Sequence, residues 1–239
     1  MRKIIFTFFI VFLFVSQGSA QDGGFYFGPK AGLTIATQNW NEAERKPLLN
    51  YHFAAFIESI DYKYKGSLFA QIGYHTRGSS IFVSNINNGL RFSEGYKFRN
   101  ISLLLGAKKR LITEKLTTPY YFFGVRAEYL VSDNLDEIQD LFSNSPSALF
   151  YPIDVYTNTF VYGVSFGGGI EYLGSAYVQP TLEVTFSPDF SFQYQSPEIP
   201  NVVSPYDGRT TTIPERRIRN ITFEVSLVVR FLREVIYTD

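Results

Sequence analysis

The sequence contains no cysteine among its 239 residues, and it carries a single tryptophan, a single methionine and two histidines. The missing thiols exclude a disulfide scaffold, a thiolate metal site, a cysteine nucleophile and a lipid anchor on cysteine. Charge of one sign is not in excess either, because 22 Lys and Arg residues balance 22 Asp and Glu residues. A chain without a basic surplus is not expected to bind nucleic acid.

Long hydrophobic runs are confined to the start of the chain. A basic beginning at Arg2, an apolar stretch and the small residues Gly18-Ser19-Ala20 follow the pattern of a secretory signal peptide. Residues 1–20 are therefore predicted to be cleaved, which leaves residues 21–239 as the mature domain. No later apolar run reaches the roughly 20 residues that a transmembrane helix needs. If the mature domain crosses a membrane, it must do so as a closed barrel.

Aromatic residues are abundant, with 24 Phe and 17 Tyr, and they recur at every second position. This period of two is typical of β-strands, and such rings also suit membrane interfaces. The segment around 25–35 is an example, since Phe27, Leu33 and Ile35 alternate with Lys30 and Thr34. The alternation predicts eight strands, at about 25–35, 49–61, 67–77, 98–109, 120–131, 159–172, 176–186 and 219–231.

The connections between these segments alternate between long and short. The long ones span 37–48, 78–97, 132–158 and 187–218, and the short ones span 62–66, 110–119 and 173–175. Outer-membrane barrels have this asymmetry, with short periplasmic turns and long external loops. The sequence therefore predicts an all-β fold, an eight-stranded antiparallel up-and-down transmembrane β-barrel in the outer membrane. A soluble lipocalin-like barrel is the alternative, with its apolar face inward.

Charged residues on the polar face favour the membrane barrel. A soluble barrel would either bury these charges or expose rows of Phe and Tyr, whereas a membrane barrel directs the charges into its lumen. The predicted lumen charges are Lys30, Glu58, Lys108, Arg126, Glu128, Glu183, Glu224 and Arg230. They are expected to pair, Lys30 with Glu224 across the closing seam, and Arg126 or Lys108 with Glu128, Glu183 or Glu58. Eight strands leave an interior that side chains fill, so an open porin is not expected.

The two histidines are predicted to face each other. If the turn at 62–66 pairs residues whose numbers sum to 127, His52 lies opposite His75 and both point into the lumen. Such a pair offers a metal site or a pH-sensitive site. Two imidazoles alone make an incomplete zinc site, so no metal or other cofactor is assigned and zinc is expected to bind no tighter than micromolar.

An enzymatic role has little support in the sequence. A lipid-modifying hydrolase would need a serine near His75, and Ser67, Ser79, Ser80 and Ser102 are the candidates. No G-x-S-x-G motif is present. Gly167-Gly168-Gly169 lies within an alternating segment without a following helix, so it is interpreted as room for a bend or for bulky lumen side chains rather than as a phosphate loop.

The long connections are predicted to carry any binding function. Segment 132–158 contains Asp136 and Asp140 and the spacing of one short amphipathic helix. Segment 187–218 contains five prolines followed by Arg216 and Arg217. The two arginines are candidate contacts for lipopolysaccharide phosphates. The acidic and basic segments could also dock on each other or bind a protein partner, and a solvated surface is the alternative.

Four stretches resemble a known family. Phe27 to Thr34 (FGPKAGLT), Ser67 to Gly78 (SLFAQIGYHTRG), Asn100 to Arg110 followed by Tyr120 to Ser132, and Tyr162 to Tyr172 (YGVSFGGGIEY) are similar to strands of the PorT-like outer-membrane barrel domains of the Bacteroidota. The resemblance implies a small eight-stranded barrel and, through the namesake, an association with protein secretion. It also implies outer-membrane lipids and the barrel-assembly machinery as partners. We therefore expect a non-enzymatic outer-membrane protein with a structural or adhesive binding role.

Overall fold

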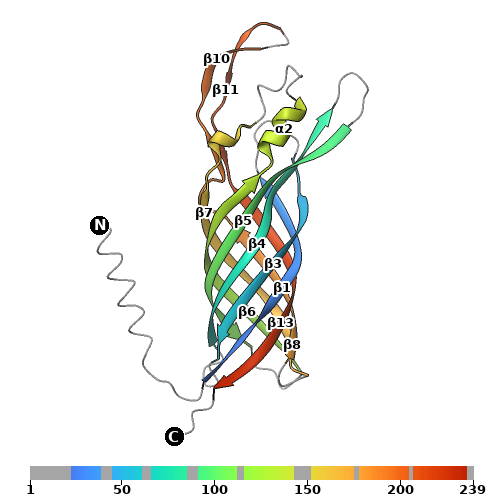
Figure 1. Ribbon diagram of the computed structural model, residues 1–239, viewed down its shortest axis with the longest axis vertical. Helices are drawn as coiled ribbons and strands as arrows, with labels where there is room; N and C mark the ends of the chain where they lie inside the picture. Colours follow the sequence, from blue (N-terminus) through green and yellow to red (C-terminus); the bar gives the residue numbers. More distant parts are fainter. Residues whose placement is uncertain are drawn as a thin grey trace, which may run out of the picture.

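The computed structural model describes residues 23–38, 45–60, 66–84, 91–111, 116–142, 152–174, 178–204 and 207–235. The predicted signal peptide lies outside these residues. The described chain forms one closed antiparallel barrel with a smaller folded extension at one end (Figure 1).

Eight long strands make the barrel. They are β1 (Gly23–Gln38), β3 (Leu48–Ser59), β4 (Gly66–Ser84), β5 (Arg91–Arg110), β6 (Thr117–Asp133), β7 (Phe160–Tyr172), β8 (Val178–Pro188) and β13 (Asn220–Val235). Each strand pairs with the next, and the pairing of β1 with β13 closes the cylinder. The two-residue strand β2 (Arg45–Lys46) only extends the edge of β4. The predicted up-and-down barrel is confirmed.

The barrel is inside out compared with a soluble protein. Along β6, Tyr121, Phe123 and Val125 point outward and are 56–58% exposed, whereas Arg126 and Glu128 point inward and are at most 4% exposed. Exposed large apolar side chains on every barrel strand suit lipid and not water. The soluble lipocalin-like alternative is therefore wrong, because the apolar face points away from the lumen. None of the described helices has the length and hydrophobicity to cross a membrane.

The two ends of the barrel differ. β1 begins and β13 ends together, with Gly23 opposite Val235, at the end that carries the short turns between β3 and β4, β5 and β6, and β7 and β8. We call this the turn end. The opposite ends of the strands lie at the loop end, where β10 (Ile199–Val203), β11 (Thr210–Ile213) and α2 (Leu135–Phe142) stand above the barrel (Figure 1).

Several predicted boundaries were wrong at the loop end. The segment 78–97 was predicted to be a loop, but β4 and β5 stay paired from Gly78–Lys97 as far as Ser84–Arg91. Small and polar residues interrupt the apolar alternation there without breaking the backbone pairing. At the turn end, the last strand was predicted to end at about Phe231, but β13 continues to Val235.

Segment 187–218 is not a simple loop. It folds into two short ribbons, β9 (Tyr194–Ser196) with β12 (Arg216–Ile218), and β10 (Ile199–Val203) with β11 (Thr210–Ile213). Prolines are tolerated in such two-stranded ribbons because every strand is an edge. The predicted amphipathic helix is confirmed as α2 (Leu135–Phe142), and a short 3-10 helix, η2 (Asp154–Tyr156), follows it.

These loop-end elements share a small apolar core, which we call the platform core. It contains Tyr96, Phe98, Leu135, Ile138, Tyr194 and Ile218. Leu130 and Tyr156 pack against it. The core thus joins β5, α2, β9 and β12, and it gives the loop end a folded structure of its own.

Candidate functional site

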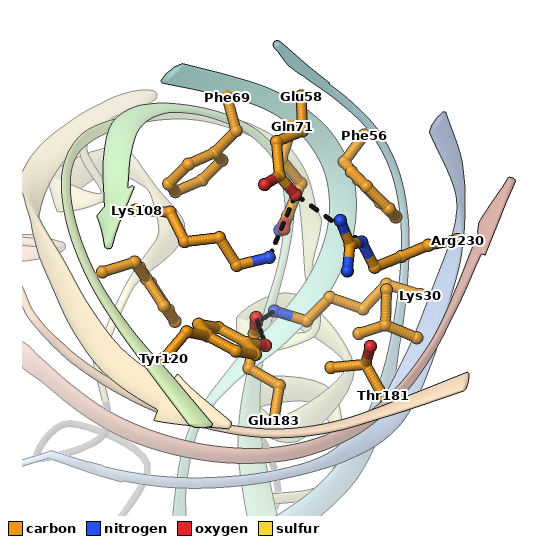
Figure 2. Close-up of a pocket in the computed structure, with 12 residues that line it drawn as sticks. Lys30, Phe56, Glu58, Phe69, Gln71, Lys108, Tyr120, Thr181, Glu183 and Arg230 are labelled. Carbon is orange, nitrogen blue, oxygen red and sulfur yellow. Dashed lines mark hydrogen bonds and ion pairs between the residues drawn. The ribbon is translucent and has the colours of Figure 1, made fainter. Parts of the chain in front are cut away.

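The turn-end half of the lumen is filled by a network of ion pairs, which we call the turn-end cluster. Its members are Lys30, Glu58, Lys108, Arg110, Glu171, Glu183 and Arg230. Lys30 Nζ lies 2.6 Å from Glu183 Oε1, and Lys108 Nζ lies 3.0 Å from Glu58 Oε2 and 2.8 Å from Glu171 Oε1. Figure 2 shows Lys30, Lys108, Arg230 and the carboxylates of Glu58 and Glu183 reaching from different walls toward the centre of the lumen.

Tyr120 completes this cluster. Its hydroxyl donates to Glu183 Oε2 at 2.5 Å, and the ammonium of Lys108 lies 4.0 Å from the centre of its ring. Glycines on β7 make room for the ring, because a Cβ on Gly169 would lie 2.6 Å from Tyr120 Oη. A Cβ on Gly167 would likewise lie 2.9 Å from the Phe122 ring. The triple glycine therefore admits bulky lumen side chains, as predicted.

The loop-end half holds a second network, the loop-end cluster. It consists of Arg77, Arg126, Glu128, Asp189 and Glu224, together with the two histidines. Glu128 Oε1 forms ion pairs with Arg77, whose Nη2 lies 2.6 Å away, and with Arg126, whose Nε lies 2.9 Å away, and Arg126 also binds Asp189. All five charged residues are at most 5% exposed.

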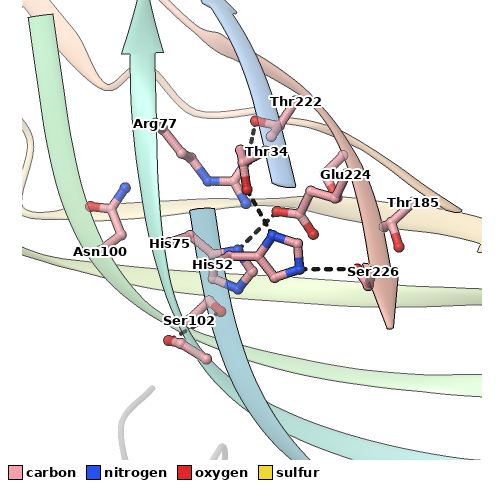
Figure 3. Close-up of polar contacts among 12 residues, drawn as sticks. Thr34, His52, His75, Arg77, Asn100, Ser102, Thr185, Thr222, Glu224 and Ser226 are labelled. Carbon is pink, nitrogen blue, oxygen red and sulfur yellow. Dashed lines mark hydrogen bonds and ion pairs between the residues drawn. The ribbon is translucent and has the colours of Figure 1, made fainter. Parts of the chain in front are cut away.

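The predicted histidine pair is confirmed in its register. His52 lies opposite His75, and their rings stack with centroids 5.3 Å apart and planes inclined by 11° (Figure 3). His75 Nδ1 lies 2.8 Å from Glu224 Oε1, while His52 contacts the Thr34 hydroxyl at 2.8 Å and the Ser226 hydroxyl at 3.0 Å. The pair is therefore held by a carboxylate and two hydroxyls.

Glu224 adds a third candidate ligand to the histidines. One ligand atom from each of His52, His75 and Glu224 lies within 4.8 Å of the others. A metal ion lies close to the plane of each imidazole that binds it, and two nearly parallel stacked rings do not share such a position. The observed packing thus fits hydrogen bonding better than metal binding, and weak zinc binding stays a prediction.

Most predicted lumen pairings have new partners or additional ones. Lys30 was predicted to reach Glu224, but it binds Glu183. The reason is the register, because Lys30 lies opposite Val228 whereas Glu224 lies opposite Thr34, about four residues nearer the loop end. The pairs of Arg126 with Glu128 and of Lys108 with Glu58 are present as expected.

Sequence reasoning missed several members of the two clusters. They are Arg77, Arg110, Tyr120, Glu171 and Asp189. Arg77 and Glu171 stand on the polar face of the predicted strands, so the same alternation signal could have found them. Arg110 and Asp189 lie one and three residues beyond the predicted strand ends, where that signal stops.

Three of the four serines proposed for an enzyme form hydrogen bonds with groups other than a histidine. Ser67 Oγ donates to Glu58 at 2.6 Å, Ser79 Oγ to Gln38 at 3.3 Å, and Ser102 Oγ to the Gly73 carbonyl at 3.5 Å. The serine beside a histidine is Ser226, which was not predicted, and it contacts His52 inside the packed lumen. Both residues are at most 1% exposed, so this contact has no access for a substrate.

Polar side chains close the loop-end mouth of the barrel. Asn220 accepts a hydrogen bond from Gln38 Nε2 at 2.7 Å and donates to Asp189 at 2.8 Å and to Gln193 at 3.1 Å. Gln193 in turn donates to the Asn158 carbonyl at 3.2 Å. This chain of amides connects the loop-end cluster to the platform above it. The described lumen residues therefore form a packed interior, as eight strands predict.

The predicted external residues lie on the platform. Asp136 and Asp140 are exposed on α2, whose Leu135 and Ile138 face the platform core. Arg217 is exposed on β12 and lies 2.7 Å from Glu215, whereas Arg216 is only 8% exposed. The guanidinium of the nearby Arg219 lies 4.3 Å from the centre of the Phe192 ring. Of the two predicted arginines, Arg217 offers its side chain to solvent.

The barrel resembles several solved outer-membrane proteins at low sequence identity. The outer membrane protein OprG from Pseudomonas aeruginosa shares 8% identity over 88% of this chain and 97% of its own, with a TM-score of 0.48. Neisserial surface protein A shares 9% over 87% and 97%, with a TM-score of 0.42. AlkL shares 8% over 93% and 96%, with a TM-score of 0.44. No protein-family model and no curated protein matches the chain.

Proposed function

We propose that this chain is an integral outer-membrane barrel without an open pore, and that its loop-end platform is a binding surface. The observation that carries the proposal is the platform core, which folds the longest connections into a fixed structure above a packed lumen. Binding residues are commonly held on loops by a rigid scaffold. On this view the barrel is the anchor and the platform is the working part.

The lipid-facing surface supports the location. Exposed apolar side chains occur on all eight barrel strands, from Phe27 on β1 to Leu227 on β13. The short turns then lie in the periplasm and the platform lies outside the cell. The proposed partners are outer-membrane lipids, the barrel-assembly machinery, lipopolysaccharide phosphates that contact Arg217, and a protein that binds the platform.

Two further proposals concern the family of this chain and the absence of enzymatic activity. Membership of the PorT-like group, and with it an association with protein secretion, stays a prediction from the four similar stretches. The non-enzymatic role is proposed because the Ser226–His52 contact is buried and His75 is bound to Glu224. A His75→Ala variant that lost lipid turnover would replace this view with the lipid-modifying enzyme.

The first test concerns the anchor. Cell fractionation and a gel that compares heated with unheated samples should give a heat-modifiable band in the outer-membrane fraction. Purified protein in a planar bilayer should give no steady ohmic conductance. A soluble band or a stable open channel would contradict the proposal.

The second test concerns the platform. Ser196 and Arg216 are paired, so a short Asn-Gly turn can replace residues 197–215 and leave β9 and β12 intact. A photo-cross-linking residue at Val203, 61% exposed on β10, should trap a discrete protein adduct in living cells. The same residue at lipid-facing Tyr121 is the matched control. The role would be only structural under two results together. The deletion variant folds and behaves as the parent in every binding and adhesion assay, and the full-length protein gives no adduct at Val203.

A further inference from the structure

The turn-end cluster encloses a small cavity. Its volume is about 30 Å³, and its polar lining includes three cations, two carboxylates and a threonine: Lys30, Lys108, Arg230, Glu58, Glu183 and Thr181. A buried polar cavity holds a water molecule when about 10–15 Å³ is accessible to it, so this one has room for one or two waters or one monatomic ion. The cavity is separate from the platform, so a ligand bound in it is independent of the proposed binding function of the platform.

Arg230 leaves hydrogen-bond donors unused beside this cavity. A guanidinium has five N–H groups. Nη1 of Arg230 binds Glu171 Oε2 at 2.7 Å and Gln179 Oε1 at 3.2 Å, while one face of the group stacks on Tyr26 at 3.8 Å. Among the described residues, its Nε and Nη2 have no hydrogen-bond partner, and Nε is 3.8 Å from the nearest carboxylate oxygen of Glu58. The residue is only 1% exposed.

Thr181, on the neighbouring strand β8, adds a further unused group. Its hydroxyl is buried and makes no hydrogen bond within the part of the chain that the structure describes. In Figure 2 the Arg230 guanidinium, the Lys30 ammonium and the Thr181 hydroxyl all stand around the middle of the lumen. Unsatisfied buried donors are costly, so this arrangement calls for an acceptor.

The charge around the cavity selects the kind of acceptor. The turn-end cluster contains four cations, Lys30, Lys108, Arg110 and Arg230, and three carboxylates, Glu58, Glu171 and Glu183. The surplus is one positive charge at this end of the lumen, and its balance lies in the loop-end cluster, where three carboxylates accompany two arginines. A monovalent anion in the cavity would balance the surplus locally, whereas a water molecule would supply only a hydrogen-bond acceptor.

We propose that the turn-end cavity binds one monatomic halide, chloride under ordinary conditions, held by Arg230 and Thr181 with the ammonium of Lys30 nearby. The site is too small for sulfate or an organic acid. A halide enclosed there completes the lumen network and stabilises the folded barrel.

The test compares two salts of equal ionic strength. Purified protein is refolded into vesicles in 0.2 M sodium chloride or 0.2 M sodium gluconate, and urea unfolding is followed in each. With a dissociation constant of about 50 mM, chloride should raise the ratio of folded to unfolded protein about 5-fold. Bromide should act as chloride does, and crystals grown in bromide should show anomalous scattering in the cavity.

Two threonine variants make the test specific. Thr181→Val removes the cavity hydroxyl and keeps every ion pair, so it should reduce the chloride response. Thr185→Val is the matched control, because Thr185 faces the lumen on the same strand, does not line the cavity and loses in this variant only a long hydrogen bond of 3.5 Å to Glu183. Equal stability in both salts, an equal response in the two variants, or a cavity that holds water in the bromide crystals would overturn the proposal.

Discussion

The chain builds two cores of opposite character, one inside the barrel and one above it. The lumen buries Lys30, Glu58 and Arg77 at 1–3% exposure, whereas the platform core buries Phe98, Leu135 and Ile138 at 0–2%. The difference follows from the surroundings, because lipid takes the apolar faces of the barrel strands and water takes the polar faces of the platform. The buried side chains are therefore polar inside the barrel and apolar in the platform above it.

The two cores also differ in what holds them together. Charges in the lumen are stable only as a complete set, since each ion left alone would carry a large desolvation cost. The platform core depends on area and close packing, where each residue contributes separately. The cores should therefore respond differently to single substitutions.

The largest effect is expected at Glu58, the most connected carboxylate of the turn-end cluster. It receives Lys108 at 3.0 Å, Ser67 at 2.6 Å and also Arg110. Glu58→Gln keeps the shape and leaves the cations short of one partner, which should cost about 3–5 kcal/mol of unfolding free energy. Urea unfolding in vesicles measures the loss.

A matched control for Glu58 is the exposed Glu215, whose side chain is 43% exposed beside Arg217. Glu215→Gln should change the unfolding free energy by less than about 0.5 kcal/mol. Equal losses in the two variants would mean that the lumen network does not act as a set.

A substitution in the platform core should have a large effect that stays local. Ile138→Ala leaves a cavity between α2 and its neighbours and should destabilise the platform by about 2–5 kcal/mol. Limited proteolysis is expected to cut the loop-end elements faster, while the heat-modifiable barrel band is unchanged. Loss of the band would show that the barrel depends on the platform.

The sequence was enough to predict the barrel because the alternation is long. Eight segments of about ten residues each repeat the same period, and the connections between them alternate between longer and shorter ones. The same regularity placed His52 opposite His75, since a turn of known span sets the register on both sides. Strand pairing and lipid exposure constrain the residues of a strand one after another, so both produce a period of two in the sequence.

The lumen pairings and the platform could not be predicted in the same way. A lysine side chain reaches past its neighbouring strand, and so Lys30 binds Glu183 on β8 and not Glu224 on β13. β9 and β12 have three residues each, too few to show a period. Their packing against α2 depends on contacts between distant segments, which the local sequence does not record.

Within the lumen, the loop-end cluster should tolerate a lost charge better than the turn-end cluster. Glu224 lies in contact with His75, and Gln at this position can still accept a hydrogen bond from the imidazole. Glu224→Gln should therefore cost about 1–2 kcal/mol, clearly less than Glu58→Gln in the same assay. A loss as large as that at Glu58 would erase the distinction between the two halves.

The smallest effect on stability is expected on the outer surface of the platform. Arg217 lies 2.7 Å from Glu215, but its side chain is 54% exposed and solvent screens the pair. Arg217→Ala should change the unfolding free energy by less than about 0.5 kcal/mol. The variant should nevertheless bind less lipopolysaccharide in a vesicle co-sedimentation assay, because an exposed guanidinium can bind phosphate in two-point fashion. If Arg217→Ala leaves lipopolysaccharide binding unchanged and the neighbouring Arg219→Ala reduces it, the phosphate contact lies directly before the start of β13. The exposed face of the platform then binds another ligand.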